Sequence, residues 1–499
     1  MAESFAISRS HLMYGVCLPL AVLVGYFLAT PFESDSLSVV ILVLSVLSVP
    51  LLMRWHYPLL IFSWNAPIFF SLLPGRLSLG VVMVGISLTF SLMDRTVGRK
   101  VDFFGSRSVS RSLVFLTAVI VITAVLTGGV GVRALGSASF GGRKYLLLFM
   151  GVLGYFAMVG QRMPRHRVGM YVALFYLSGL LIFPGLLGDL GGPSMDFLHA
   201  ILPESFETEG DGASEAVTRF GSINFATMGL FCFLLMRYGL RGVLDIHHPW
   251  RATLLLLAIL GSLFAGFRSV LVMYALILGA LFYWEGLLRT RLVAIIVLAG
   301  ILGLAITMPF VRHFPLSVQR TLSFLPVEVD PIAQASADAS TEWRLDMWRE
   351  LLPEVPKYLF LGKGYAVDPN DMFMVWQSEL RGFGKAAEFA RLNGDYHSGP
   401  FSLIIPFGIF GVFGFAWFSV ASLQVLYKNY RYGDPALLRV NTFLLAIFIA
   451  RLIFFLTVFG SFSSDLINFA GLVGFGVTLN RDELGRGGPE KDAPRVLPG

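Results

Sequence analysis

Apolar blocks of 16 residues or more recur along almost the whole of this 499-residue chain. A helix needs about 20 mainly apolar residues to cross a bilayer, and a water-soluble fold has little use for so many blocks of that kind. The composition agrees, because 56% of the residues are apolar and only 14% are charged, whereas soluble domains carry roughly 25% charged residues. The sequence therefore predicts an all-α polytopic membrane protein and excludes a soluble enzyme, a disordered chain and a nucleic-acid-binding protein.

The spacing of the apolar blocks predicts about 12–14 transmembrane helices. The two cysteines, Cys17 and Cys232, both lie inside apolar blocks, so no disulfide framework or cysteine metal site is expected. The fourteen candidate spans are 12–29, 37–53, 57–73, 77–93, 112–127, 145–160, 170–187, 222–238, 251–267, 270–286, 292–310, 400–426, 438–459 and 463–480.

The basic residues predict the orientation of the chain. If the N-terminus is cytoplasmic, 22 of the 38 basic residues fall on the cytoplasmic side and only 6 fall in the short outer loops. Cytoplasmic loops of membrane proteins carry such an excess of lysine and arginine. We therefore expect both termini in the cytoplasm and the long segment 311–399 on the periplasmic face.

The long segment divides the chain. It is far longer than a connection requires, it is rich in aromatic residues, and a helix is expected from Thr341 to Leu352, where Pro353 follows. We interpret it as a small ordered lid on the membrane face. The predicted organisation is an N-terminal transmembrane bundle (1–310), the periplasmic loop or lid (311–399), C-terminal transmembrane helices (400–480) and a disordered cytoplasmic tail (481–499).

A histidine lies where the long segment re-enters the membrane. His397 is followed by Ser398, then by nine residues, then by the run Gly408-Ile409-Phe410-Gly411-Val412. Its position alone is also typical of an ordinary interfacial histidine. The whole pattern, however, resembles the O-antigen ligase and O-antigen polymerase superfamily, whose members show His-(Asn/Ser/Gln)-x9-Gly-x-x-Gly-(Thr/Val) in this location.

Three further segments strengthen the resemblance, which covers roughly residues 219–425. The superfamily has an arginine and a tryptophan four residues apart and a Gly-x-Gly turn in its long outer loop; here they are Arg344 with Trp348, and residues 362–365. It also has a small-residue-Arg-Ser/Gly pattern at a membrane boundary, which residues 266–269 (Gly-Phe-Arg-Ser) match except that phenylalanine replaces the small residue.

The resemblance implies a GT-C-like membrane glycosyltransferase of the ligase or polymerase type. Its donor would be a polyprenyl-diphosphate-linked glycan, and its acceptor would be a sugar hydroxyl of lipid A-core or of another glycan. His397 would act as the catalytic general base. A diphosphate is already a good leaving group, so no metal and no cofactor are expected. The alternative is a transporter or flippase of lipid-linked oligosaccharide, which would also need many spans.

Outward-facing arginines are the predicted substrate-binding residues. Arg219, Arg268 and Arg344 lie on the outer side, against the positive-inside trend, and guanidinium groups bind phosphate oxygens in a bidentate manner. The alternative interpretation is that these arginines only anchor the ends of the transmembrane spans at the lipid headgroups. Two structural expectations complete the analysis: Arg451, inside a span, pairs with Asp465 across the last hairpin, and the glycines at 408, 411 and 414 let a neighbouring helix pack closely.

Overall fold

The computed structural model describes residues 34–70, 77–96, 103–128, 142–185, 217, 219–367, 369–380, 391–392 and 394–481, with the isolated positions 19, 21, 22, 25, 195 and 202. Most of the expected span 12–29 and of the tail 481–499 lies outside these residues. The chain forms two compact units, Met1–Leu59 and Leu60–Gly499. Helix α2 (Ser34–Ser63) begins in the first unit and ends in the second.

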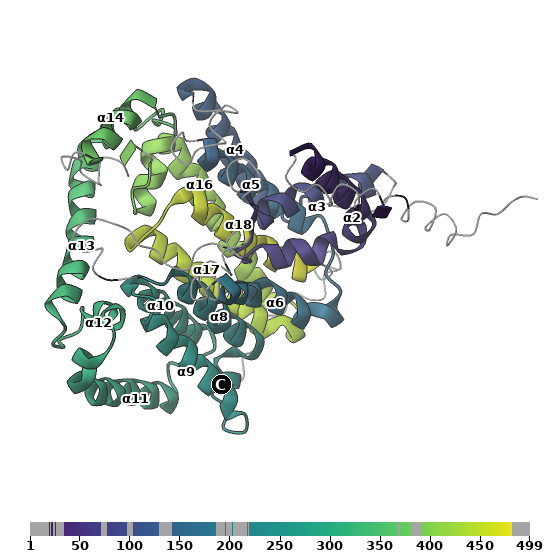
Figure 1. Cartoon of the computed structure of the whole chain (residues 1–499). Coiled ribbons are helices and arrows are strands. Elements are labelled where there is room, and N and C mark those ends of the chain that lie inside the picture. The colour runs from purple at the N-terminus through teal and green to yellow at the C-terminus, as the bar shows by residue number, and fades with distance from the viewer. Residues whose placement is uncertain are drawn as a thin grey trace, which may run out of the picture. The chain divides into compact units, whose positions relative to one another are not determined.

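Helices make up nearly all of the described chain, which confirms the predicted all-α polytopic membrane fold. Within the described residues, nine helical segments are long and apolar enough to cross a membrane, and α9 and α10 are shorter apolar helices. The elements of the larger unit (Figure 1) are β1 (Phe69–Phe70), β2 (Leu77–Ser78), α3 (Leu79–Thr96), α4 (Arg107–Thr127), α5 (Gly142–Val159), η3 (Arg165–Arg167), α6 (Val168–Leu177), η4 (Ser178–Ile182), α8 (Gly221–Val243), α9 (Pro249–Leu263), α10 (Arg268–Trp284), α11 (Arg291–Thr307), η7 (Met308–His313), α12 (Leu316–Leu322), α13 (Pro331–Leu351), η8 (Leu352–Tyr358), α14 (Pro369–Leu380), α16 (Gly399–Tyr432), η9 (Pro435–Leu437), α17 (Leu438–Thr457) and α18 (Phe462–Leu479).

The prediction of a transmembrane span at residues 57–73 is wrong. Helix α2 continues from the preceding apolar block and ends at Ser63. The chain then forms β1, which pairs antiparallel with β2. Asn65 donates its side-chain amide to the Phe175 carbonyl at 2.7 Å, and Pro67 has no backbone N–H to donate, so the chain does not continue as a helix here. The apolar pattern predicted burial correctly but not the type of element.

Aromatic side chains form the core of the C-terminal helices. Phe443, Phe448, Phe455, Phe469 and Phe475 are each at most 2% exposed, on α17 and α18. Helix α18 packs along α5, and α16 packs along α4. These packed helices support the start of α16, the end of α17 and the start of α18.

Helix α16 is interrupted near its N-terminal end. Gly408 has φ 60° and ψ −160°, two residues after Pro406 inside the helix. The chain from Leu359 to Gly364 fills the break, because the Lys363 N–H donates to the Ile405 carbonyl at 2.7 Å and the Ile409 N–H donates to the Leu359 carbonyl at 2.7 Å. The Gly-x-Gly turn of the long segment is therefore bonded directly to the glycine motif that follows His397.

The close-packing expectation holds for only part of the glycine series. A Cβ at Gly414 would lie 3.0 Å from Leu116 of α4, so this glycine does lie at a helix contact. Gly408 instead provides the left-handed backbone of the break, and its Cβ would lie 2.7 Å from the carbonyl oxygens of Leu359 and Phe360. Periodicity alone does not separate these two uses of glycine.

We expect Gly408→Ala to lower the free energy of unfolding by about 2 kcal/mol or more, because a non-glycine residue in a sparsely allowed conformation costs roughly 1–3 kcal/mol before any clash is counted. Thermal unfolding of the detergent-solubilised protein measures it. Gly279→Ala in α10 is the matched control, since nothing lies within 4 Å of its added Cβ. Equal unfolding temperatures for the two variants would contradict the role of Gly408.

Most of the described residues of the long segment 311–399 are helical. Figure 1 shows α12, α13 and α14 following one another along one side of the larger unit. Helix α13 begins at Pro331, ten residues before the expected Thr341, and the Asp330 carboxylate caps it by accepting from the Ile332 N–H at 2.8 Å. Its first half contains mainly alanine, serine and aspartate, so it has no apolar periodicity that would predict a helix.

Candidate functional site

His397 lies at the start of α16, in an unusual backbone conformation. Its φ is 47°, the one positive value at a non-glycine residue in the described part of the chain. Such conformations cost free energy and are concentrated at functional sites. A Cβ at Gly399 would collide with the Phe455 carbonyl, and Gly460 lies against Gly399. This close approach brings the end of α17 beside His397.

The imidazole of His397 contacts two aromatic rings. Its centroid is 4.7 Å from the Trp343 ring on α13 and 5.1 Å from the Phe459 ring after α17. The side chain is 23% exposed, so it is held by packing and still accessible. Three separate parts of the chain therefore meet at this histidine.

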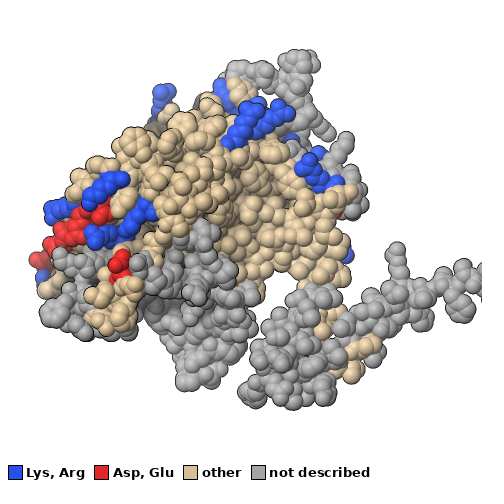
Figure 2. All heavy atoms as spheres, turned by 90° about the horizontal axis from the view of Figure 1, so that it is seen from above, with Lys and Arg blue, Asp and Glu red and all other residues tan. Residues whose placement is uncertain are grey.

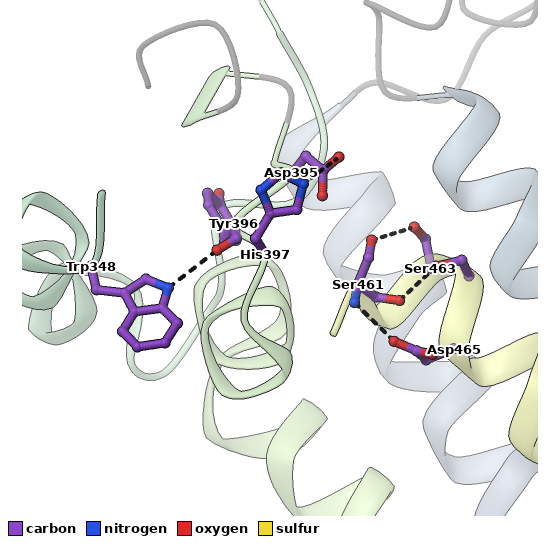
Figure 3. A network of polar contacts seen from close by, with 8 residues as sticks. Trp348, Asp395, Tyr396, His397, Ser461, Ser463 and Asp465 are labelled. Atoms are coloured by element: carbon purple, nitrogen blue, oxygen red, sulfur yellow. Dashed lines mark hydrogen bonds and ion pairs between the residues drawn. The ribbon is translucent and has the colours of Figure 1, made fainter. Parts of the chain in front are cut away.

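A hydrogen bond and a small core fix the chain next to His397. Trp348 donates its indole N–H to the Tyr396 carbonyl at 3.4 Å, which Figure 3 shows beside His397. Below it, Met347, Leu351, Tyr396 and Ile405 form a buried cluster. Burial raises the pKa of the Tyr396 phenol, so this group stays protonated at neutral pH and does not act as a base.

Asp395 is the carboxylate next to the histidine. One of its oxygens lies 4.0 Å from Nε2 of His397, and its side chain is 45% exposed. Lys144 of α5 lies within electrostatic reach of Asp395, with its ammonium 5.4 Å from the centre of the Tyr365 ring. Lys144 is a site residue that the sequence analysis missed, because it comes from the N-terminal half, where no motif indicates it.

Arg344 lies close to His397. Its guanidinium carbon is 5.8 Å from the centre of the Phe459 ring, the same ring that contacts the imidazole. Trp343, whose ring also contacts the imidazole, directly precedes Arg344 on α13. The structure therefore brings together two of the residues predicted from the sequence.

Arg219 and Arg268 both contact α13 at the turn before Arg344. Arg219 donates to the Ser340 hydroxyl at 3.2 Å. Arg268 donates to the Ala337 carbonyl at 2.6 Å and to the Thr341 hydroxyl at 3.0 Å. Thr341 and Arg344 are three residues apart, which is a rise of about 4.5 Å along a helix. One stretch of α13 therefore carries Arg344 and contacts the other three predicted site residues, Arg219, Arg268 and His397.

The groups of α13 that accept hydrogen bonds from Arg219 and Arg268 are uncharged. They are two hydroxyls and a carbonyl. Asp338 is the carboxylate that acts on Arg268, while the like charge of Arg219 opposes it.

The surface near the lid carries a different charge pattern. Figure 2 shows acidic and basic side chains gathered together on the side where Figure 1 has α13 and α14, and little charge over most of the rest of that face. Ion pairs at this end of the lid include Arg349 with Asp346 at 3.0 Å and Arg391 with Glu354 at 3.6 Å. Both of these arginines are thus paired with carboxylates.

Arg320 of α12 is a further arginine of the cluster that the sequence analysis did not select. It is 3% exposed and donates to the Ser336 hydroxyl at 3.0 Å, to the Ser340 hydroxyl at 2.8 Å and to the Gly266 carbonyl. It is one of nine basic residues in 311–399, and no local pattern distinguishes it from the others. Only the folded arrangement does so.

The expected ion pair between Arg451 and Asp465 does not form. Asp465 instead accepts a hydrogen bond from the Ser461 N–H at 2.9 Å and so caps the start of α18, as Figure 3 shows. In the described part of the chain, no nitrogen of Arg451 lies within 4.0 Å of this carboxylate. The carboxylate lies one turn into α18, where the unsatisfied N–H groups of the helix start attract it.

Comparison with known proteins addresses the region of the site. A family model described as O-Antigen ligase matches residues 252–416, which run from α9 into α16 and include Arg268, Arg320, Arg344 and His397. Arg219 precedes the matched region. No curated protein matches the chain. Residues 252–416 are therefore similar to the O-antigen ligase family, and the resemblance of the sequence to the O-antigen ligase and polymerase superfamily is confirmed over that part of the chain.

Proposed function

We propose that this protein transfers a glycan from a polyprenyl-diphosphate carrier to a sugar hydroxyl on the periplasmic face of the bacterial inner membrane. One observation carries the proposal: a single helix, α13, contacts both the arginine cluster and the histidine. Arg219 and Arg268 donate to residues 337–341 of this helix, and Trp343, two residues further on, packs on His397. A diphosphate and an accessible base would therefore be only a few ångströms apart along the helix.

His397 is the catalytic general base in this proposal. It removes the proton of the acceptor hydroxyl as that oxygen attacks the anomeric carbon of the donor glycan. The new glycosidic C–O bond forms while the bond to the diphosphate oxygen breaks. Asp395, at 4.0 Å, stabilises the imidazolium that results. The proton stays on His397 until water takes it up.

The arginines bind and stabilise the leaving group. Negative charge grows on the diphosphate as its bond to the sugar breaks, and guanidinium groups aimed at that charge lower the barrier. Arg268 and Arg219 lie at the α13 turn that includes Ser340, and Arg344 lies next to the imidazole. The set of substrate-binding residues is therefore Arg219, Arg268 and Arg344, and no metal is required in this mechanism.

The proposal is tested with the purified protein in vesicles, a defined polyprenyl-diphosphate oligosaccharide and two acceptors offered in parallel. The acceptors are lipid A-core, as for a ligase, and a second lipid-linked glycan, as for a polymerase. We expect one of them to be extended, with one polyprenyl diphosphate released per bond formed. Movement of intact donor across the vesicle membrane without release of the diphosphate would instead indicate a transporter.

The periplasmic location of the site is a separate prediction from the distribution of basic residues. Topology reporters fused at Gly433 and at Ala387, which lies outside the described residues, are expected to score as cytoplasmic and periplasmic, respectively. The same fusions made at the two termini should both score as cytoplasmic. A periplasmic signal at Gly433, or the same side at both internal positions, would overturn the orientation.

A further inference from the structure

We propose that Arg320 is a positioning residue that holds the two diphosphate-binding arginines, Arg219 and Arg268, in place. Arg320 is 3% exposed, so its guanidinium does not reach a substrate. It instead donates to Ser336 and Ser340 of α13, the helix that both arginines contact, and to Gly266 in the turn before Arg268. The inference rests on the proposed function, since it assigns Arg320 a role in binding the same donor.

The link to Arg268 runs through the backbone. Gly266, with φ 78°, forms the turn between α9 and α10, and Arg268 is the first residue of α10. Arg320 donates to the carbonyl of Gly266, two residues before Arg268. A shift of this turn would move the Cα of Arg268, and with it the guanidinium that contacts Ala337 and Thr341.

The link to Arg219 runs through a shared acceptor. The Ser340 hydroxyl accepts from Arg320 at 2.8 Å and from Arg219 at 3.2 Å. With both lone pairs of its oxygen engaged, the hydroxyl is fixed in orientation and holds the two guanidinium groups side by side. Without Arg320, the Ser340 hydroxyl can rotate, and its hydrogen bond to Arg219 is weakened.

The small residues of α13 make this arrangement possible. Ala333, Ser336 and Ala337 are each fully buried, and with Ser340 they form one face of the helix. Larger side chains on this face would push α12 away and leave no space for a buried guanidinium. The first half of α13, which has no apolar pattern, therefore serves as the surface on which arginines from three segments converge.

Two other residues of α12 form hydrogen bonds to the end of α9 and to the start of α13. Thr321 donates to the Leu263 carbonyl at the end of α9 at 3.0 Å. Gln319 accepts from the Asp330 N–H at 2.7 Å, where α13 begins. Arg320 lies between these two contacts and adds the bonds to Gly266, Ser336 and Ser340. Only a planar guanidinium has donors that diverge towards three such acceptors, so a lysine ammonium cannot replace it fully.

The test compares Arg320→Lys with Arg312→Lys, which is the matched control. Arg312 precedes α12 in the same segment, and its pair with Glu328 is 63% and 79% exposed, so its replacement should have little effect. Affinity is measured with farnesyl diphosphate as the probe, on the full chain in detergent. We expect at least tenfold weaker binding for Arg320→Lys, and affinity close to that of the wild type for Arg312→Lys.

Hydrogen exchange provides a readout that does not depend on the donor. Arg320→Lys should raise exchange in residues 331–341 and 265–268 while exchange in α17 and α18 stays unchanged, which separates local loosening from general unfolding. Unchanged exchange in the two segments would overturn the positioning role. Raised exchange together with wild-type affinity for the probe in Arg320→Lys would also overturn the positioning role, provided that Arg268→Ala binds the probe weakly. If Arg268→Ala binds the probe as tightly as the wild type, the proposed donor site fails instead, and exchange alone decides the role of Arg320.

Discussion

Replacing His397 is expected to lower the rate of glycan transfer by about 10²–10⁴-fold, the usual loss when a general base is removed. Two variants are needed because the backbone here has φ 47°. His397→Ala removes the base but places alanine in a conformation that it disfavours. His397→Asn also removes the base, and asparagine tolerates the left-handed region better than most residues. We therefore expect both variants to lose activity and His397→Asn to keep nearly the wild-type unfolding temperature.

The control for this prediction is His313→Ala. His313 is an exposed histidine at the end of η7 in the same long segment, and in the proposed mechanism it contacts nothing that reacts. Its replacement should leave the initial rate of product formation unchanged. Near-full activity of purified His397→Asn would show that the histidine is only an interfacial residue packed against two aromatic rings.

Arg268→Ala is expected to have the second largest effect, a loss of about 10²–10³-fold in rate, which is the range seen when one donor to a developing negative charge is removed. Arg268→Lys should recover part of the rate, since it restores the charge but not the two-pronged geometry. Arg219→Ala and Arg344→Ala should lower the rate less. Arg268 is expected to matter most because it starts α10 directly after a tight turn.

Chelation by EDTA is the companion measurement, because the arginines would do the work that a divalent cation does in many sugar transferases. Activity should survive EDTA and should not be raised by magnesium or manganese. Arg349→Ala on α13 is the control variant, since that side chain is 76% exposed and paired with Asp346. Loss of activity in EDTA that magnesium restores would indicate a metal site instead, with Asp395 as its first candidate ligand.

The sequence predicts the membrane helices well because apolar length and composition decide them locally. It predicts less where a polar segment folds against the rest of the protein. The alanine- and serine-rich first half of α13 has no periodic apolar face, so its helix was not expected, although tertiary contacts bury Ala333 and Ala337 completely. The break at Gly408 was also missed, because a glycine series looks the same whether it packs a helix or interrupts one.

The site residues also divide into those that the sequence predicts and those that it does not. His397 and Arg344 were predicted because they belong to motifs with fixed spacing, and the structure brings them to one aromatic ring, that of Phe459. Arg320 and Lys144 were not predicted, since nothing adjacent to them in the sequence distinguishes them from other basic residues. Their roles depend on which segments the fold brings together, and one sequence read locally does not contain that information.

The length of α9 and α10 has a consequence for the surrounding lipid. The two helices have 15 and 17 residues, so they extend only about 22–26 Å at 1.5 Å per residue. A typical hydrocarbon core is about 30 Å thick, and a bilayer next to short helices thins to match them. On the proposed orientation, the turn that carries Arg268 would then lie at the bottom of a dimple in the outer leaflet, and the phosphate groups of neighbouring lipids would be drawn down to its level. A carrier lipid would reach the arginines from the side, within the plane of the membrane, without leaving the bilayer.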